Sequence, residues 1–80
     1  MVDVLARVMR AGADLSAGGR VYLRLRRMDG AYERWFFASD NTKKEMLTIG
    51  LTAMSAGLPV VATLASEVEY DTIISLSLSY

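Results

Sequence analysis

Apolar and polar residues alternate along several stretches of the chain, with the period of two that is typical of β-strands. The clearest stretch is residues 20–38, RVYLRLRRMDGAYERWFFA, in which two alternating segments flank Asp29 and Gly30. An Asp-Gly pair favours a two-residue type I′ turn, because both central positions of that turn need positive φ. The stretch therefore predicts a β-hairpin.

Counting outward from this turn gives the register of the hairpin. One face would be mostly apolar, with the pairs Val21–Ala38, Leu23–Phe36 and Leu25–Arg34. The other face would carry an opposite-charge pair, a cation–π contact and an aromatic pair, namely Arg26–Glu33, Arg24–Trp35 and Tyr22–Phe37. A slip of one residue would exchange the two faces, so the pattern specifies this register.

Three further strands are expected. Residues 2–9 fit both a strand and a helix, and we interpret them as a strand because they are rich in β-branched residues. Residues 60–64 form a short apolar strand that begins just after Pro59, and residues 73–80 alternate cleanly. The stretch 11–19, rich in small residues, is interpreted as a connection, and 65–71 as an acidic loop.

One helix is expected between the third and fourth strands, in the sequence TKKEMLTIGLTAMSAGLP at 42–59. Thr42 and Glu45 have capping-box spacing, and Gly57 followed by Pro59 predicts its end. Its apolar residues cover roughly 220° of the helix circumference, counted at about 100° per residue. A surface helix needs an apolar arc of only about 100° or a little more. This excess predicts that the helix packs against more than its own domain.

The order strand, strand, strand, helix, strand, strand predicts a mainly β (α+β) fold, a five-stranded OB-fold barrel in a single domain spanning residues 1–80. Barrels of this class commonly bind oligonucleotides or oligosaccharides. The fold alone does not assign a function.

Composition adds a reason to expect self-association. The chain has 80 residues, of which 52% are hydrophobic, and its net charge is zero. A domain this small buries only about 60% of the surface that its unfolded chain exposes. Assembly into a homo-oligomer would cover the remaining apolar surface, and a dense monomeric core with tolerated surface apolar residues is the alternative.

Composition also restricts the chemistry. The chain has no cysteine and no histidine, which excludes a disulfide, a cysteine nucleophile and a Cys/His zinc site. No apolar run is long enough to predict a membrane span, and the first residues do not read as a signal peptide, so we assign no localisation from the chain itself. Zero net charge makes nucleic acid an unfavoured partner.

The carboxylates do not suggest catalysis. Asp29, Glu33 and Glu45 are explained by a turn, a cross-strand arginine and helix capping. Glu67 and Asp71, with Glu69 between them, form a short acidic run that we interpret as a solvated loop; a weak calcium site there would match no known ligand spacing. We therefore expect a protein that is not an enzyme and needs no metal or cofactor.

Arginines and aromatic residues of the hairpin are the best binding candidates. They are Arg20, Tyr22, Arg24, Arg26, Tyr32 and Trp35. Such a surface can stack on nucleobases, can pack on the apolar face of a sugar ring while arginine binds hydroxyl or carboxylate groups, or can form a subunit interface. The sequence leaves these three alternatives open.

The run SDNTKKEMLTIGLTAMSAGLPVVATL, a helix that ends in Ser55 and Gly57 and is followed by Val60 and a strand, resembles the binding subunits of bacterial toxins with one A and five B chains. The similarity is greatest to the subtilase-cytotoxin and pertussis-like branch, and GRVYLRL (19–25) and RWFFAS (34–39) resemble the preceding hairpin. The resemblance implies a small OB-fold, a pentameric ring and recognition of cell-surface glycans by several weak sites that gain strength from avidity. It also implies secretion and an A-type partner subunit.

In a ring of this kind the helices would surround a central channel and contact their neighbours. The resemblance thereby suggests the interface and channel residues Lys44, Met46, Thr48, Ile49, Thr52, Ala53 and Ser55. It assigns no sugar-binding residue to this chain. The alternatives are a single-stranded nucleic-acid-binding OB module and a ring with a purely structural role.

Overall fold

The computed structural model describes residues 1–14 and 18–79. Its elements follow the predicted order: β1 (Val2–Asp14), β2 (Arg20–Arg27), β3 (Glu33–Ala38), α1 (Lys43–Ala56), β4 (Val60–Leu64) and β5 (Thr72–Leu78). Tyr80, the last residue of the predicted final strand, lies outside the described residues.

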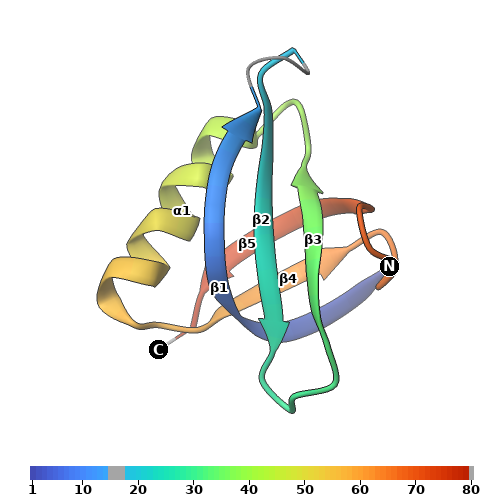
Figure 1. The fold of residues 1–80 in the computed structure, drawn as a ribbon, viewed down its shortest axis with the longest axis vertical. Coiled ribbons are helices and arrows are strands. Elements are labelled where there is room, and N and C mark those ends of the chain that lie inside the picture. The colour runs from blue at the N-terminus through green and yellow to red at the C-terminus, as the bar shows by residue number, and fades with distance from the viewer. Residues whose placement is uncertain (15–17, 80) are drawn as a thin grey trace.

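The five strands close into a barrel in the order β1-β2-β3-β5-β4, with β4 pairing back onto β1. Every pairing is antiparallel except that of β3 with β5, which is parallel. In Figure 1, β1 curves round the barrel from its pairing with β4 to its pairing with β2, while α1 lies along one side. The predicted fold class, an OB-fold-like barrel with its helix between the third and fourth strands, is confirmed.

Strand β1 is longer than predicted, because Arg10 and residues 11–14 of the expected connection continue the strand opposite β2. The pairing with β2 shifts register between Val8 and Arg10, which leaves Met9 as an extra residue. A bulge of this kind bends a strand and strengthens its twist, so that one strand can serve two neighbours.

The predicted register of the hairpin is confirmed, with Arg26 opposite Glu33 and Tyr22 opposite Phe37. The predicted type I′ turn is wrong, because Gly30 has a φ of 79° whereas Asp29 is not among the residues with positive φ. Arg27 donates its N–H to the Tyr32 carbonyl oxygen at 3.0 Å, so the loop closed by this pair spans four residues, 28–31. Within it, the Asp29 carboxylate accepts a hydrogen bond from the backbone N–H of Ala31 at 2.9 Å. A four-residue loop adds one residue to each side of a two-residue loop and therefore preserves the register.

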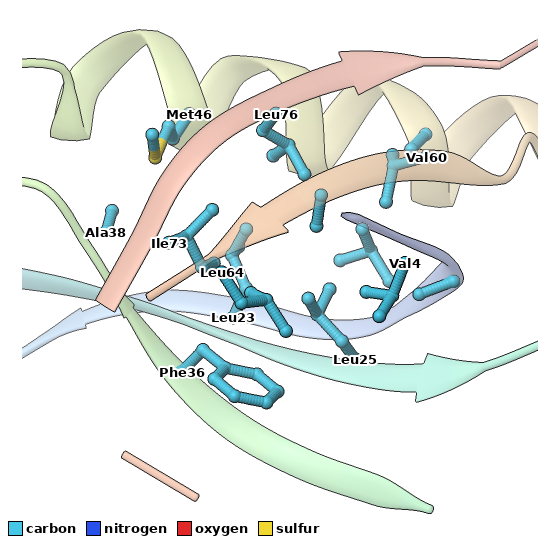
Figure 2. Close-up of a cluster of buried hydrophobic side chains, with 14 of the residues drawn as sticks. Val4, Leu23, Leu25, Phe36, Ala38, Met46, Val60, Leu64, Ile73 and Leu76 are labelled. Carbon is cyan, nitrogen blue, oxygen red and sulfur yellow. The ribbon is translucent and has the colours of Figure 1, made fainter. Parts of the chain in front are cut away.

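The core fills the barrel and extends to the underside of the helix. In Figure 2, Leu23, Leu64 and Ile73 lie between Met46 of the helix and the ring of Phe36. These residues come from four different strands and the helix, and all are buried. The predicted apolar face of the hairpin supplies Val21, Leu23, Leu25, Phe36 and Ala38.

Helix α1 packs through a narrow stripe of small and flexible residues, Met46, Gly50 and Ala53. A Cβ at Gly50 would lie 2.9 Å from Leu23 Cδ2, so the helix approaches β2 closely at this point. Leu51 and Met54 remain exposed, at 49% and 42%. The helix therefore hides only part of its apolar surface in its own barrel.

The sequence predicted the C-terminal end of α1 correctly but not its N-terminal cap. Gly57 adopts the left-handed conformation with a φ of 66°, and Leu58 donates its N–H to the Ala53 carbonyl oxygen at 2.9 Å, so the predicted C-terminal glycine is confirmed. The predicted capping box is wrong, since Thr42 makes no side-chain cap hydrogen bond. Its ψ of 17° is far from the extended conformation that usually directs a capping side chain toward the helix.

Within the described part of the chain, no helix has the length and apolar character that crossing a membrane requires.

Candidate ligand-binding site

A shallow pocket of about 340 Å³ lies on the outer face of the barrel where β1, β2 and β3 run side by side. It is lined by Arg10, Asp14, Tyr22, Trp35, Phe37 and Tyr70. We call this set the aromatic pocket. In OB-folds the face of strands 2 and 3, together with the loops between strands 1 and 2 and between strands 4 and 5, is the usual ligand-binding surface.

Strand register places these side chains together. Tyr22 lies opposite Phe37 on β3 and opposite Gly12 on β1, although its ring contacts Trp35 and not Phe37 as predicted. Trp35 lies two residues before Phe37 in β3 and therefore on the same outer face of that strand. Successive residues of a strand point to opposite faces of the sheet. The alternation that directs apolar side chains into the barrel core therefore also directs the aromatic side chains between them to the outer face, where they line the pocket.

The rings meet in two pairs. Tyr22 and Trp35 contact edge to face, with centroids 5.1 Å apart and an interplanar angle of 74°. Phe37 and Tyr70 lie closer to parallel, at 6.1 Å and 32°. Both separations fall in the range at which aromatic pairs attract each other. Each of the four rings is therefore packed against one other ring of the pocket.

Two arginines lie beside the aromatic pocket, against the rings that line it. The Arg20 guanidinium lies 3.7 Å from the ring centroid of Phe37, and that of Arg24 lies 5.3 Å from the ring of Trp35. The predicted cation–π contact of Arg24 with Trp35 is thus present. The carboxylate of Glu33 forms an ion pair with Arg24, not with Arg26 as predicted, although Arg26 is its directly opposite neighbour.

Tyr70 enters the pocket from the loop between β4 and β5. It is the one residue other than glycine with a positive φ, 71°, among the described residues. Two backbone hydrogen bonds attach the loop to β3. The Tyr70 N–H donates to the Trp35 carbonyl oxygen at 2.7 Å, and the Phe37 N–H donates to the Asp71 carbonyl oxygen at 3.0 Å. A left-handed non-glycine residue costs free energy and is often found at functional sites.

The acidic residues of this loop bind different partners. Glu67 pairs with Arg27, and Glu69 accepts the N–H of Trp35 at 3.2 Å. Asp71 accepts hydrogen bonds from the Ser66 hydroxyl and the Thr72 N–H, and these bonds hold the pKa of its carboxyl below the usual value. Among the described residues no three acidic side chains come together in a way that could hold a metal ion.

Two of the predicted ligand-binding residues lie elsewhere. Tyr32 packs against Phe36, with the Arg34 guanidinium 4.3 Å from its ring centroid. Burial, followed by the nearby charge of Glu67, raises the pKa of the Tyr32 hydroxyl. Arg26 lines a separate pocket near the hairpin turn. The structure thus brings Tyr22 and Trp35 together in the pocket, with Arg20 and Arg24 stacked on its rings.

The predicted interface and channel residues of the helix separate into two groups. Met46 and Ala53 are buried in the core of their own barrel, so they are not available to line a channel of a ring. Ile49 is half-buried. The exposed members of the set are Lys44, Thr48, Thr52 and Ser55. Neighbouring Leu51 and Met54, which the sequence did not single out as interface residues, are the large exposed apolar residues of α1.

Sequence reasoning did not single out Arg10, Asp14 or Tyr70 as site residues. Asp14 was missed because 11–19 was interpreted as a connection, and Arg10 because the predicted strand ended at residue 9. Tyr70 was missed because no local signal indicates the parallel pairing of β3 with β5. Comparisons of the chain with protein-family models, with curated proteins and with solved structures find no match.

Proposed function

We propose that this protein is a non-enzymatic carbohydrate-binding module that uses the aromatic pocket as its sugar site. The observation that carries the proposal is the gathering of four aromatic rings, Tyr22, Trp35, Phe37 and Tyr70, around one concavity on the OB-fold ligand face. Its volume of about 340 Å³ is at the lower end of the range for small-molecule sites. A site of this size suits one or two sugar residues.

The chemistry of the pocket supports a sugar better than a polyanion. Ring faces and edges pack against the C–H groups of a sugar, while Arg10 can donate to hydroxyl oxygens and Asp14 can accept from hydroxyl groups. The chain carries no net positive charge, which disfavours binding to a phosphate backbone. Hydroxyl recognition uses both donors and acceptors, which this pocket offers.

We further propose that the module works as a homo-oligomeric ring, with five subunits as the expected number. Exposed apolar residues support this. Leu5 and Val61 lie directly opposite each other on the outer face of β1 and β4, and Leu51 and Met54 lie on α1. Several equivalent weak sites on one ring would bind a multivalent glycan surface far more tightly than one site does.

The test of the sugar site is a glycan array probed with the assembled protein, followed by titration of any binding sugar. We expect binding to at least one glycan class, and we expect Trp35→Ala to abolish it. Tyr32→Phe is the matched control, because it changes an aromatic residue outside the aromatic pocket and should bind as well as the unaltered chain. An array without any binding glycan, or binding that survives Trp35→Ala, would contradict the proposal.

A further inference from the structure

A second pocket near the hairpin turn contains a like-charge pair. Arg7 on β1 and Arg26 on β2 lie directly opposite each other, and both line a pocket of about 200 Å³ together with Met9, Arg27, Met28 and Gly30. We propose that this arginine pocket is a separate binding site for a sulfate- or phosphate-type oxyanion. It shares no lining residue with the aromatic pocket.

The pairing of Arg7 with Arg26 calls for a compensating charge. Like charges at directly opposite positions of a β-sheet destabilise the pairing. Arg26 also lies opposite Glu33, which would be the natural partner, but Glu33 is engaged by Arg24. Within the described residues the side chain of Arg26 has no ion pair or hydrogen bond, so its guanidinium is free to bind an anion.

The other two arginines are fixed in position. Arg7 donates one N–H to the carbonyl oxygen of Gly57 at 3.0 Å, at the C-terminal end of α1, where a cation is favoured by the helix dipole. This bond uses one of the five guanidinium N–H groups and leaves the others for a ligand. Arg27 is already paired with two carboxylates, Asp29 at 3.1 Å and Glu67 at 3.0 Å, so it forms a wall of the pocket but adds no net positive charge to it.

Shape and surroundings favour an oxyanion. Guanidinium groups bind tetrahedral and planar oxyanions through pairs of parallel N–H···O bonds, which a spherical chloride does not offer. Met9, placed by the bulge in β1, and Met28 form the apolar part of the wall. The pocket volume is several times the ~30 Å³ that one water occupies in the liquid, so an oxyanion with some of its waters fits.

The test is an NMR titration of the full chain, labelled with ¹⁵N, using sodium sulfate and, in a separate series, sodium phosphate. Ionic strength is kept constant with sodium chloride, and the arginine Nε–H signals are followed. We expect saturable shifts at Arg7 and Arg26, and a Kd raised about tenfold or more in Arg26→Gln, the effect of losing one charge-assisted guanidinium contact. Lys43→Gln is the matched control, because it removes one positive charge at the start of α1, outside the arginine pocket, and its Kd should not change.

A second readout keeps the test valid if the variant alters stability. Without added oxyanion, Arg26→Gln should have a slightly higher Tm than the unaltered chain, because the like-charge pair is removed. Sulfate should then raise the Tm of the unaltered chain more than that of Arg26→Gln, a difference that its general salting-out effect cannot produce. Equal Kd values in the two proteins, or shifts that do not saturate at Arg7 and Arg26, would overturn the proposal.

Two further probes identify the group that carries the anion. N-acetylglucosamine 6-sulfate and glucose 6-phosphate each present one oxyanion on a sugar, and tighter binding of either through Arg26 supports the site and names its source. The titration with inorganic sulfate does not depend on the aromatic pocket, so Trp35→Ala should leave it unchanged. Failure here and failure of the proposed sugar site are therefore separate results.

Discussion

The hydroxyl end of Tyr22 lies directly against Gly12 on the neighbouring strand. A Cβ at position 12 would be 2.8 Å from Tyr22 Oη and 3.0 Å from its Cζ, closer than side chains normally approach. The absence of a side chain at Gly12 thus sets the position of the Tyr22 ring, which in turn contacts Trp35 at 5.1 Å. A backbone position on β1 determines the geometry of an aromatic pair on β2 and β3.

Gly12→Ala should displace the Tyr22 ring and weaken sugar binding several-fold. Stability should change by less than about 1 kcal/mol, because the ring can move and because Ala is favoured over Gly in a strand by about 0.5–1 kcal/mol. Affinity by titration and Tm by thermal unfolding measure the two effects. Ala13→Ser, a change at the adjacent exposed residue, is the control, and an unchanged affinity in Gly12→Ala would separate Tyr22 from the sugar site.

Tyr70 allows binding and stability to be separated. The left-handed conformation costs about 1–2 kcal/mol for a residue with a Cβ, and glycine avoids this cost. Glycine in turn destabilises the folded state by about 0.5–1 kcal/mol, because the unfolded chain gains conformational entropy. Because the side chain is 60% exposed, Tyr70→Gly should leave the free energy of unfolding within about 1 kcal/mol of the original value. We expect sugar affinity to fall in Tyr70→Gly and to be largely retained in Tyr70→Phe. A Tyr70→Gly protein that binds normally would show that this ring is not part of the site.

Tyr32 should make stability depend on pH under alkaline conditions. Its hydroxyl is buried without a hydrogen-bond partner among the described residues, and burial raises its pKa in the folded chain above the ordinary value of 10.0. The unfolded chain therefore loses this proton first, so the stability contributed by protonated Tyr32 is complete below about pH 10 and is lost as the pH rises further.

Tyr32→Phe should remove this alkaline loss of stability. It should also raise the free energy of unfolding at pH 7 by up to about 1 kcal/mol, because no unsatisfied hydroxyl remains. Urea unfolding of both proteins at pH 7 and across pH 9–11 measures the effect. Equal slopes with pH in the two proteins would show that Tyr32 is not the group responsible.

Self-association should be visible as native mass. A pentamer of 8.8 kDa chains has a mass of about 44 kDa, and light scattering over a dilution series should find this species. Leu51→Ser should shift the population toward the monomer, because Leu51 is exposed and its loss leaves the barrel core intact. Ser77→Ala, an exposed change on β5, is the control. An 8.8 kDa species at every concentration would contradict the ring.

Local patterns predicted the fold well because they act over short distances. The alternation from Val21 to Ala38 fixed both the hairpin register and the buried face, and Gly57 predicted the end of the helix. The turn type could not be predicted from Asp29-Gly30, since two-residue and four-residue loops give the same register. The four-residue loop is the one in which the Asp29 carboxylate accepts the hydrogen bond from the Ala31 N–H.

The candidate site was only partly predictable, because half of it depends on contacts distant in sequence. Tyr22 and Trp35 follow from the hairpin register alone. Tyr70 reaches Phe37 only because β3 and β5 pair in parallel when the barrel closes, which no local pattern indicates. Arg10 and Asp14 could be placed at the site only if the small residues between them were recognised as part of a strand.

The most direct measurement uses Trp35, which is the only tryptophan of the chain and lines the aromatic pocket, so that its fluorescence reports on this site alone. The protein would be titrated with a panel of neutral and sialylated oligosaccharides, and with a single-stranded oligonucleotide, at ~50 mM and ~200 mM salt, where phosphate contacts weaken steeply. We predict a saturable change with at least one oligosaccharide that hardly depends on salt for a neutral sugar and is lost in Tyr70→Gly. A response to the oligonucleotide alone, fading as salt rises, would contradict the account.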